Sequence, residues 1–222
     1  MTSITEQIAK VLSEKFISHL NYQIDYHSGG DNQAVNMIEF PNTPVGLSMA
    51  RGFNMPILLR DDWMPDQMWG MSASLGVECI VAECGGGGHL YHEWLERGVR
   101  GTFNVMCQLG MLPGKVKLPP KQYVVKNDNP EVHNLVLVLP REGGLVIPEP
   151  AITPQVFFAG QPIEGPVTFG KLLNMYDLSI REVYESPFKH TLLLASVIVP
   201  AWNNPGQIAY IYADADKAEI IE

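Results

Sequence analysis

Apolar residues recur every three or four positions in two stretches of the chain, and this spacing predicts two amphipathic helices. The first helix follows Ser3, which forms a capping-box pattern with Glu6. Its apolar face consists of Ile4, Ile8, Val11, Leu12, Phe16 and Leu20. The second helix follows the glycine run 85–88. Its inward positions are Tyr91, Trp94, Leu95, Gly98, Thr102, Val105, Met106 and Leu109.

Short runs of β-branched and apolar residues predict many strands between and after these helices. The run at 134–140 is apolar on both faces, which predicts a central strand. A turn at 203–206 predicts a hairpin that brings 207–212 back onto the strand at 192–199. Further predicted elements are strands at 22–26, 35–40, 77–84, 145–147, 156–159 and 178–184, and a short helix at 168–176.

Few helices and many short strands predict an α+β fold. We expect a mixed, mostly antiparallel sheet flanked by an N-terminal amphipathic helix and a central helix. Residues 1–222 are expected to form a single domain, with a candidate subdomain boundary at 127–130. Hydrophobic residues make up 46% of the chain and charged residues 18%, so a real core is expected and disorder is not.

The formal net charge of −9 argues against nucleic-acid or anionic-membrane binding as the main activity. The three cysteines, Cys79, Cys84 and Cys107, have no disulfide-framework spacing, which is typical of a reducing compartment. We read no signal peptide at the N-terminus. The longest apolar run, 191–199, is too short to span a bilayer. A cytoplasmic location is therefore expected.

Most candidate site residues lie in one stretch, the predicted strand, glycine run and helix at 77–96. Glycines before a helix can cradle a phosphate, but the spaced glycine motifs of nucleotide-binding loops are absent. His89, His92 and Glu93 share one helix face and are a candidate metal site, without a His-Glu-x-x-His motif. Cys84 is a candidate thiol nucleophile, with His89 or His133 as its base. A flexible loop before a solvated helix face is the simplest alternative, and no cofactor is predicted.

A second candidate surface mixes acidic residues with tryptophans. Aromatic residues often anchor protein interfaces, so this segment is a candidate patch for a basic protein partner. Its residues are Asp61, Asp62, Trp63, Asp66 and Trp69. The alternative is that Trp63 and Trp69 belong to the core beneath an acidic loop.

The order of several short motifs resembles the suppressor of fused domain, which in bacteria includes small acidic immunity proteins. The motifs are Trp69-Gly-Met-Ser72, Val77-Glu-Cys-Ile80, Leu112-Pro-Gly-Lys-Val116 and two strands ending in Leu139-Pro140 and Val199-Pro200. The resemblance implies an α/β sandwich and a binding protein without catalytic residues.

These observations favour a non-enzymatic acidic protein that binds and sequesters another protein, as an immunity or regulatory factor. The first alternative is an enzyme, either a metal-dependent hydrolase or a thiol enzyme, built on the stretch at 77–96. The second alternative is a structural subunit of a larger assembly. The oligomeric state stays open.

Overall fold

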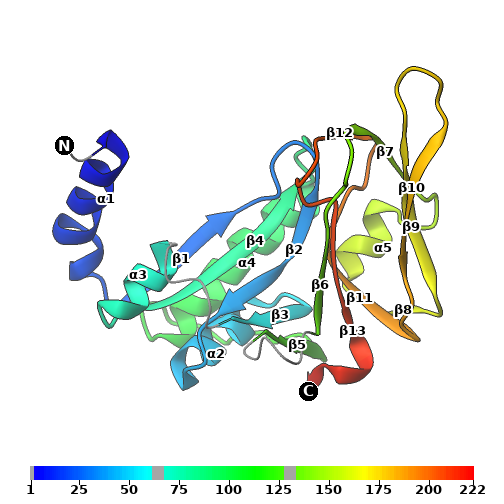
Figure 1. Cartoon of the computed structure of the whole chain (residues 1–222). Helices are drawn as coiled ribbons and strands as arrows, with labels where there is room; N and C mark the ends of the chain where they lie inside the picture. The colour runs from blue at the N-terminus through cyan, green and yellow to red at the C-terminus, as the bar shows by residue number, and fades with distance from the viewer. Residues whose placement is uncertain (1–2, 62–67, 128–133) are drawn as a thin grey trace.

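The chain folds into two β-sheets with helices packed against them (Figure 1). The computed structural model describes residues 3–61, 68–127 and 134–222. The α-helices are α1 (Ile4–Lys15), α2 (Pro44–Phe53), α3 (Met68–Ser74), α4 (His92–Gln108) and α5 (Pro154–Ala159), with short 3₁₀ helices at Ile17–His19 and Ala215–Lys217. Within the described parts of the chain, no helix is long and apolar enough to cross a membrane.

The larger sheet has ten strands and mixed pairing, because three of its pairs are parallel and the others antiparallel. Its main path contains β14 (Glu219–Ile221), β5 (Gln122–Lys126), β3 (Ile57–Arg60), β2 (Ala34–Phe40), β11 (His190–Ser196), β13 (Tyr210–Asp214) and β6 (Leu135–Val138). Three strands join off this path, namely β4 (Glu78–Gly86) on β2, β1 (Tyr22–His27) on β4, and β8 (Ile163–Glu164) on β11.

The smaller sheet is entirely antiparallel and has four strands. They are β10 (Ile180–Ser186), β9 (Val167–Leu173), β7 (Gly144–Pro148) and β12 (Ala201–Asn203). The predicted α+β class with a mixed, mostly antiparallel sheet is therefore confirmed.

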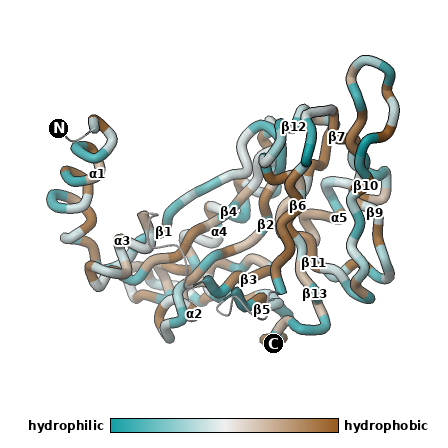
Figure 2. The backbone as a smooth tube through the Cα atoms, viewed as in Figure 1, coloured by the Kyte–Doolittle hydropathy of each residue, from teal (hydrophilic) through white to brown (hydrophobic). Residues whose placement is uncertain are grey.

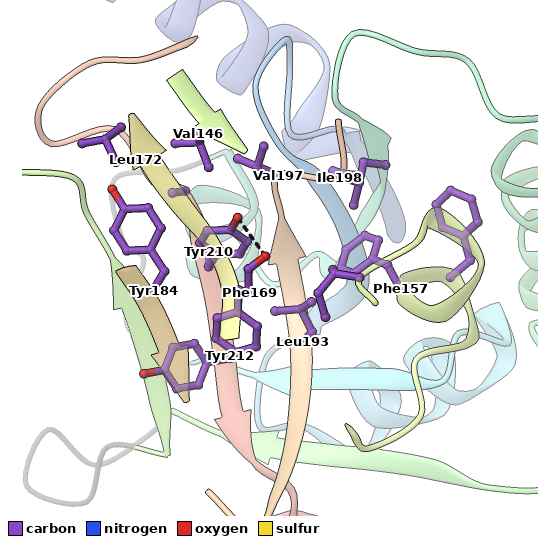
Figure 3. Close-up of a cluster of buried hydrophobic side chains, with 14 of the residues drawn as sticks. Val146, Phe157, Phe169, Leu172, Tyr184, Leu193, Val197, Ile198, Tyr210 and Tyr212 are labelled. Atoms are coloured by element: carbon purple, nitrogen blue, oxygen red, sulfur yellow. Dashed lines mark hydrogen bonds between the residues drawn. The ribbon is translucent and has the colours of Figure 1, made fainter. Parts of the chain in front are cut away.

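A shared aromatic core joins the two sheets (Figure 3). Phe169 of β9 stacks on Tyr210 of β13, with ring centroids 5.3 Å apart. Tyr212 of β13 also contacts Phe169, at 5.0 Å between centroids. Aromatic pairs of this kind add stability beyond the apolar area that they bury.

Helices α2 and α4 cover one face of the larger sheet through side chains that alternate along β2 and β4. In Figure 2 the hydrophobic colour is concentrated along β2, β4 and β6. Gly101 of α4 allows the two helices to approach closely, because a Cβ there would lie 2.5 Å from the carbonyl oxygen of Phe53 in α2.

Helix α1 forms as predicted, and both hydrogen bonds of the Ser3–Glu6 capping box are present. Its apolar face does not reach the core, however. None of its residues is buried, and Ile4 and Ile8 are 69% and 54% exposed. The helix ends at Lys15, so Leu20 lies beyond it.

Three predicted elements are wrong. Residues 168–176 lie mainly in strand β9, because pairing with β7 and β10 outweighs the helical spacing of Phe169 and Leu172. Residues 156–159 belong to helix α5, where Thr153 caps the helix and Pro154 starts it. The strand at 134–140 is not central, because β6 is the last strand of the main path and only partly buried.

Candidate functional site

The parallel pairing of β1 with β4 brings a histidine and two carboxylates together. His27 lies directly opposite Glu83 in the register of these two strands. Its Nδ1 is 3.3 Å from Oε1 of Glu83, and its Nε2 is 3.3 Å from Oδ2 of Asp25. Asp25 precedes His27 by two residues, so both side chains project from the same face of β1. The imidazole is therefore held between two carboxylates.

Burial makes the carboxyl groups of Glu83 and Glu39 hold protons more tightly than usual. Burial raises the pKa of Glu83, the neighbouring His27 lowers it and Asp25 raises it again, with a net upward shift. On the next strand, burial raises the pKa of Glu39 to about 8, with further contributions from Glu83 and Asp61. The same sheet face thus carries carboxyl groups that exchange protons closer to neutral pH than free ones do.

A pocket of about 660 Å³ opens at the ends of β1 and β4, next to His27. It lies between the loop after β1, the glycine run and helix α4. Within the polar trio, the His27 side chain is 39% exposed, whereas those of Asp25 and Glu83 are 11% and 15% exposed. His27 is the one member of the trio that lines the pocket. Its side chain projects from the face of β1 opposite to Tyr26, whose hydroxyl contacts α4.

The glycine run shapes this pocket through its backbone. Strand β4 continues to Gly86, and all four glycines have positive φ, from 67° to 119°. A Cβ on Gly86 would lie 2.3 Å from the carbonyl oxygen of Gln33, so only glycine fits there. The N–H of Gly87 donates to the carbonyl oxygen of Gln33 and the N–H of Gly88 to that of Gly30. Because these donors are already used, the run does not present the open amide cradle that a phosphate needs.

The structure does not bring the predicted metal residues together. Nδ1 of His89 lies 2.6 Å from the carbonyl oxygen of Gly87. His92 is exposed and pairs with Glu96 at 3.1 Å, while Glu93 lies in the first turn of α4. Across residues 3–61, 68–127 and 134–222, no group of three or more histidine, cysteine or acidic side chains is arranged to hold a metal ion.

The predicted thiol nucleophile is held in its unreactive form. Burial, followed by the neighbouring Glu83, raises the pKa of Cys84 to about 12, and Arg97 lowers it only in part. Cys84 is therefore a neutral thiol at physiological pH, and a thiol is a poor nucleophile compared with a thiolate. His133, one of its predicted bases, lies outside the described residues.

The predicted partner patch is described only in part. Asp61 and Trp69 are 2% and 3% exposed, so neither presents a surface for docking. Asp61 accepts a hydrogen bond from Nδ2 of Asn127, and Trp69 packs with Cys79 and Val81 of β4. The remaining members of the patch, Asp62, Trp63 and Asp66, lie outside the described residues.

Asp25 and His27 were not predicted as site residues: Asp25 belongs to the predicted strand at 22–26, and His27 was expected in the loop after it, whereas β1 extends to His27. The available signal was an acid and a histidine two residues apart at the end of a strand, followed by Ser28, Gly29 and Gly30. Residues at i and i+2 share one face of a strand, so their side chains can act together. Their partner Glu83 is distant in sequence, and only the pairing of β1 with β4 brings it close.

Several solved structures have a similar fold. The ectoine utilization protein EutE (DoeB) from Ruegeria pomeroyi superposes with a TM-score of 0.74 at 16% identity, over 96% of this chain and 66% of that one. A succinylglutamate desuccinylase/aspartoacylase from Rhodobacter sphaeroides gives 0.75 at 15% identity, over 96% and 64%. An aspartoacylase family protein from Mesorhizobium loti gives 0.68 at 16% identity, over 95% and 68%.

This chain thus spans less than two thirds of the length of the first two structures. At these identities the likeness shows the fold alone. No protein-family model and no curated protein matches the sequence.

These findings correct the predicted identity. The fold is that of desuccinylase/aspartoacylase proteins, so the resemblance to the suppressor of fused domain is wrong, and so is the predicted immunity role. The short motifs have ordinary structural places here: Trp69-Gly-Met-Ser72 lies in helix α3, with Trp69 and Ser72 buried. The prediction of a non-enzymatic binding protein is likewise overturned, and the enzyme alternative at 77–96 agrees better with the fold.

Proposed function

We propose that this chain carries the acid–base centre of a hydrolase that cleaves the amide bond of an N-acylated compound. The observation that carries the proposal is His27, held at 3.3 Å by both Asp25 and Glu83 at the wall of a pocket of about 660 Å³. The fold supports it, since the similar solved structures are named as desuccinylase and aspartoacylase enzymes.

In this proposal His27 acts as the general base. It takes a proton from a water molecule while the water oxygen attacks the amide carbonyl carbon. The C–N bond then breaks, and His27 returns the proton to the leaving nitrogen. The products are a carboxylic acid and an amine, so one water molecule is consumed for each bond cleaved.

Asp25 and Glu83 act as positioning residues for the imidazole ring. Both contacts are 3.3 Å long, whereas a strong charge-assisted hydrogen bond is about 2.8 Å. One ring nitrogen can therefore exchange its carboxylate for a water molecule, while the other carboxylate keeps the ring in place. The remaining carboxylate also stabilises the imidazolium that forms during proton transfer.

The test is hydrolysis of three amides, N-acetylaspartate, N-succinylglutamate and the uncharged N-benzoylglycinamide, followed by release of the free amine. Replacing His27→Asn is expected to lower kcat/KM by about 10²- to 10⁴-fold, the usual contribution of a general base. The matched control is His92→Asn, an exposed histidine on α4, which is expected to keep the wild-type rate.

Equal rates for wild type and His27→Asn would contradict the proposal. Failure of the wild type to hydrolyse any of the three amides would contradict it as well. Because histidine and carboxylate side chains are also metal ligands, each assay is run with a chelator and with added divalent cation. Hydrolysis that depends on the metal and on His92, rather than on His27, would instead support the metal site first considered on α4.

We also propose a cytoplasmic location. It is supported by the three cysteines, which are all unpaired, as is usual in a reducing compartment. Binding to a basic protein partner stays a prediction.

A further inference from the structure

The pocket beside His27 has an apolar, largely aromatic wall. Tyr91 and Trp94 meet edge to face with their ring centroids 5.3 Å apart. Leu95 and Val99 continue the wall along α4, and Tyr26 of β1 closes it on the other side. The hydroxyl of Tyr26 is hydrogen-bonded to Thr102 of α4, which fixes the width of this end.

Positive charge is kept out of this wall. Among the described residues that line the pocket there is no lysine or arginine, and Asp31 is the one aspartate or glutamate. The arginines of the same helix, Arg97 and Arg100, line a separate hollow together with Lys121. A carboxylate-bearing ligand therefore finds no lysine or arginine to pair with, and it meets Asp31. Of the two histidines in the lining, His27 already lies between two carboxylates and Nδ1 of His89 contacts the carbonyl oxygen of Gly87.

We propose that this pocket binds a bulky, uncharged apolar group of the substrate, aromatic or branched aliphatic, and discriminates against carboxylate-bearing groups. The inference rests on the proposed function only for placing the scissile amide beside His27. The proposed substrate therefore differs from succinylglutamate, the compound that appears in the name of a structural neighbour. The physical basis is that apolar burial favours the first class, while desolvation of an unpaired carboxylate penalises the second.

Gly98 offers a direct way to fill the pocket without disturbing the fold. It lies in the wall, and a Cβ built on it meets no atom within 4 Å. Gly98→Leu therefore places a side chain in open pocket space. Glu96→Leu is the matched control, since Glu96 is exposed on the same helix and does not line the pocket.

The experiment measures equilibrium binding of N-benzoylglycinamide and N-succinylglycinamide to the full chain by calorimetry, in the slow His27→Asn variant so that neither ligand is consumed. We expect the benzoyl compound to bind at least about tenfold more tightly. Gly98→Leu in this background is expected to weaken its binding at least about tenfold, and Glu96→Leu to leave it unchanged. Tighter or equal binding of the succinyl compound overturns the inference, as does unchanged binding by Gly98→Leu.

A charge-introducing pair tests the selectivity itself. Val99→Arg puts a cation into the wall, whereas Phe103→Arg puts one on the same helix outside it; the replaced residues are 49% and 55% exposed. We expect only Val99→Arg to shift the affinity ratio at least about tenfold towards the succinyl compound. An equal shift in both variants would mean that the net charge, rather than the pocket, decides, and it would overturn the inference.

Failure of this inference is distinguishable from failure of the proposed function. If the benzoyl compound binds as expected but wild-type protein hydrolyses no amide, the pocket assignment stands and the hydrolase proposal falls. If wild type hydrolyses only the acidic amides in a His27-dependent way, the hydrolase proposal stands and the pocket assignment falls.

Discussion

At the residue scale, burial determines how tightly carboxyl groups hold protons on one face of the larger sheet. Glu83 lies close enough to Asp25 and to Glu39 for their charges to interact, and His27 is the one group among these four that can neutralise a negative charge. Such an arrangement costs stability, because buried carboxylates repel and lose hydration. Clusters of this kind are typical of functional sites rather than of a structural core.

Glu39 makes this cost measurable. Its carboxyl group ionises at about 4.5 when unfolded and at about 8 in the fold, so the folded state binds the proton more tightly. The stabilising contribution is complete below pH 4.5 and is lost as the pH rises through 8. Removing the charge with Glu39→Gln should abolish this loss, which is on the order of 4 to 5 kcal/mol at pH 9.

The measurement is urea unfolding at pH 5 and pH 9. We expect the wild type to lose more stability between these values than Glu39→Gln does, while the exposed Glu164→Gln follows the wild type. If wild type and Glu39→Gln show the same pH dependence, the buried carboxyl group is not held protonated as described.

The site could be predicted from sequence only in its location. The strand, glycine run and helix at 77–96 do line the pocket, and Glu83 and Trp94 come from them. The histidines and the glutamate predicted there as metal ligands were grouped by helical spacing alone, and His89 lies before the first residue of α4. His27 could not be linked to Glu83, since the register of two strands distant in sequence leaves no local pattern.

At the element scale, helix α4 has two glycines that differ in how closely other atoms surround them. Gly101 faces α2, where an added Cβ would lie 2.5 Å from the carbonyl oxygen of Phe53, a backbone atom that cannot move easily. Gly98 faces open pocket space. The same substitution three residues apart should therefore have opposite effects.

We expect Gly98→Ala to raise the free energy of unfolding by about 0.5 to 1 kcal/mol, because alanine favours the helical backbone. Gly101→Ala should lower it by about 1 to 3 kcal/mol, because it overpacks the contact with α2. Both values come from denaturant unfolding of the two variants beside the wild type. Stabilisation by Gly101→Ala would show that the two helices do not pack as closely as described.

Element prediction succeeded where the pattern was local and strong, and it failed where capping signals were overlooked. Helices α1 and α4 and strands β2 and β4 follow from their periodicity. The helices α2 and α5 both begin with threonine and proline, at Thr43-Pro44 and Thr153-Pro154, and both signals were missed. Strand β9 was taken for a helix because its partners β7 and β10 decide its structure.

At the scale of the whole molecule, the sequence allowed the fold class to be predicted but not which known structures the fold resembles. Composition and short strands indicate an α+β protein, and that prediction is confirmed. Its likeness to desuccinylase/aspartoacylase structures is one of fold, with TM-scores of 0.74 and 0.75 at 16% and 15% sequence identity. The exposed apolar face of α1 is a whole-molecule feature that its own periodicity could not anticipate, since periodicity predicts a face and not what covers it.

The most direct test of the central claim is a double-mutant cycle on amide hydrolysis. It compares kcat/KM for wild type, His27→Asn, Glu83→Gln and the double variant on the amide that wild type cleaves fastest. If Glu83 acts through His27, the double variant loses no more activity than His27→Asn alone. If the two losses multiply, the residues act independently, and the account of a single histidine centre held by its carboxylates is wrong.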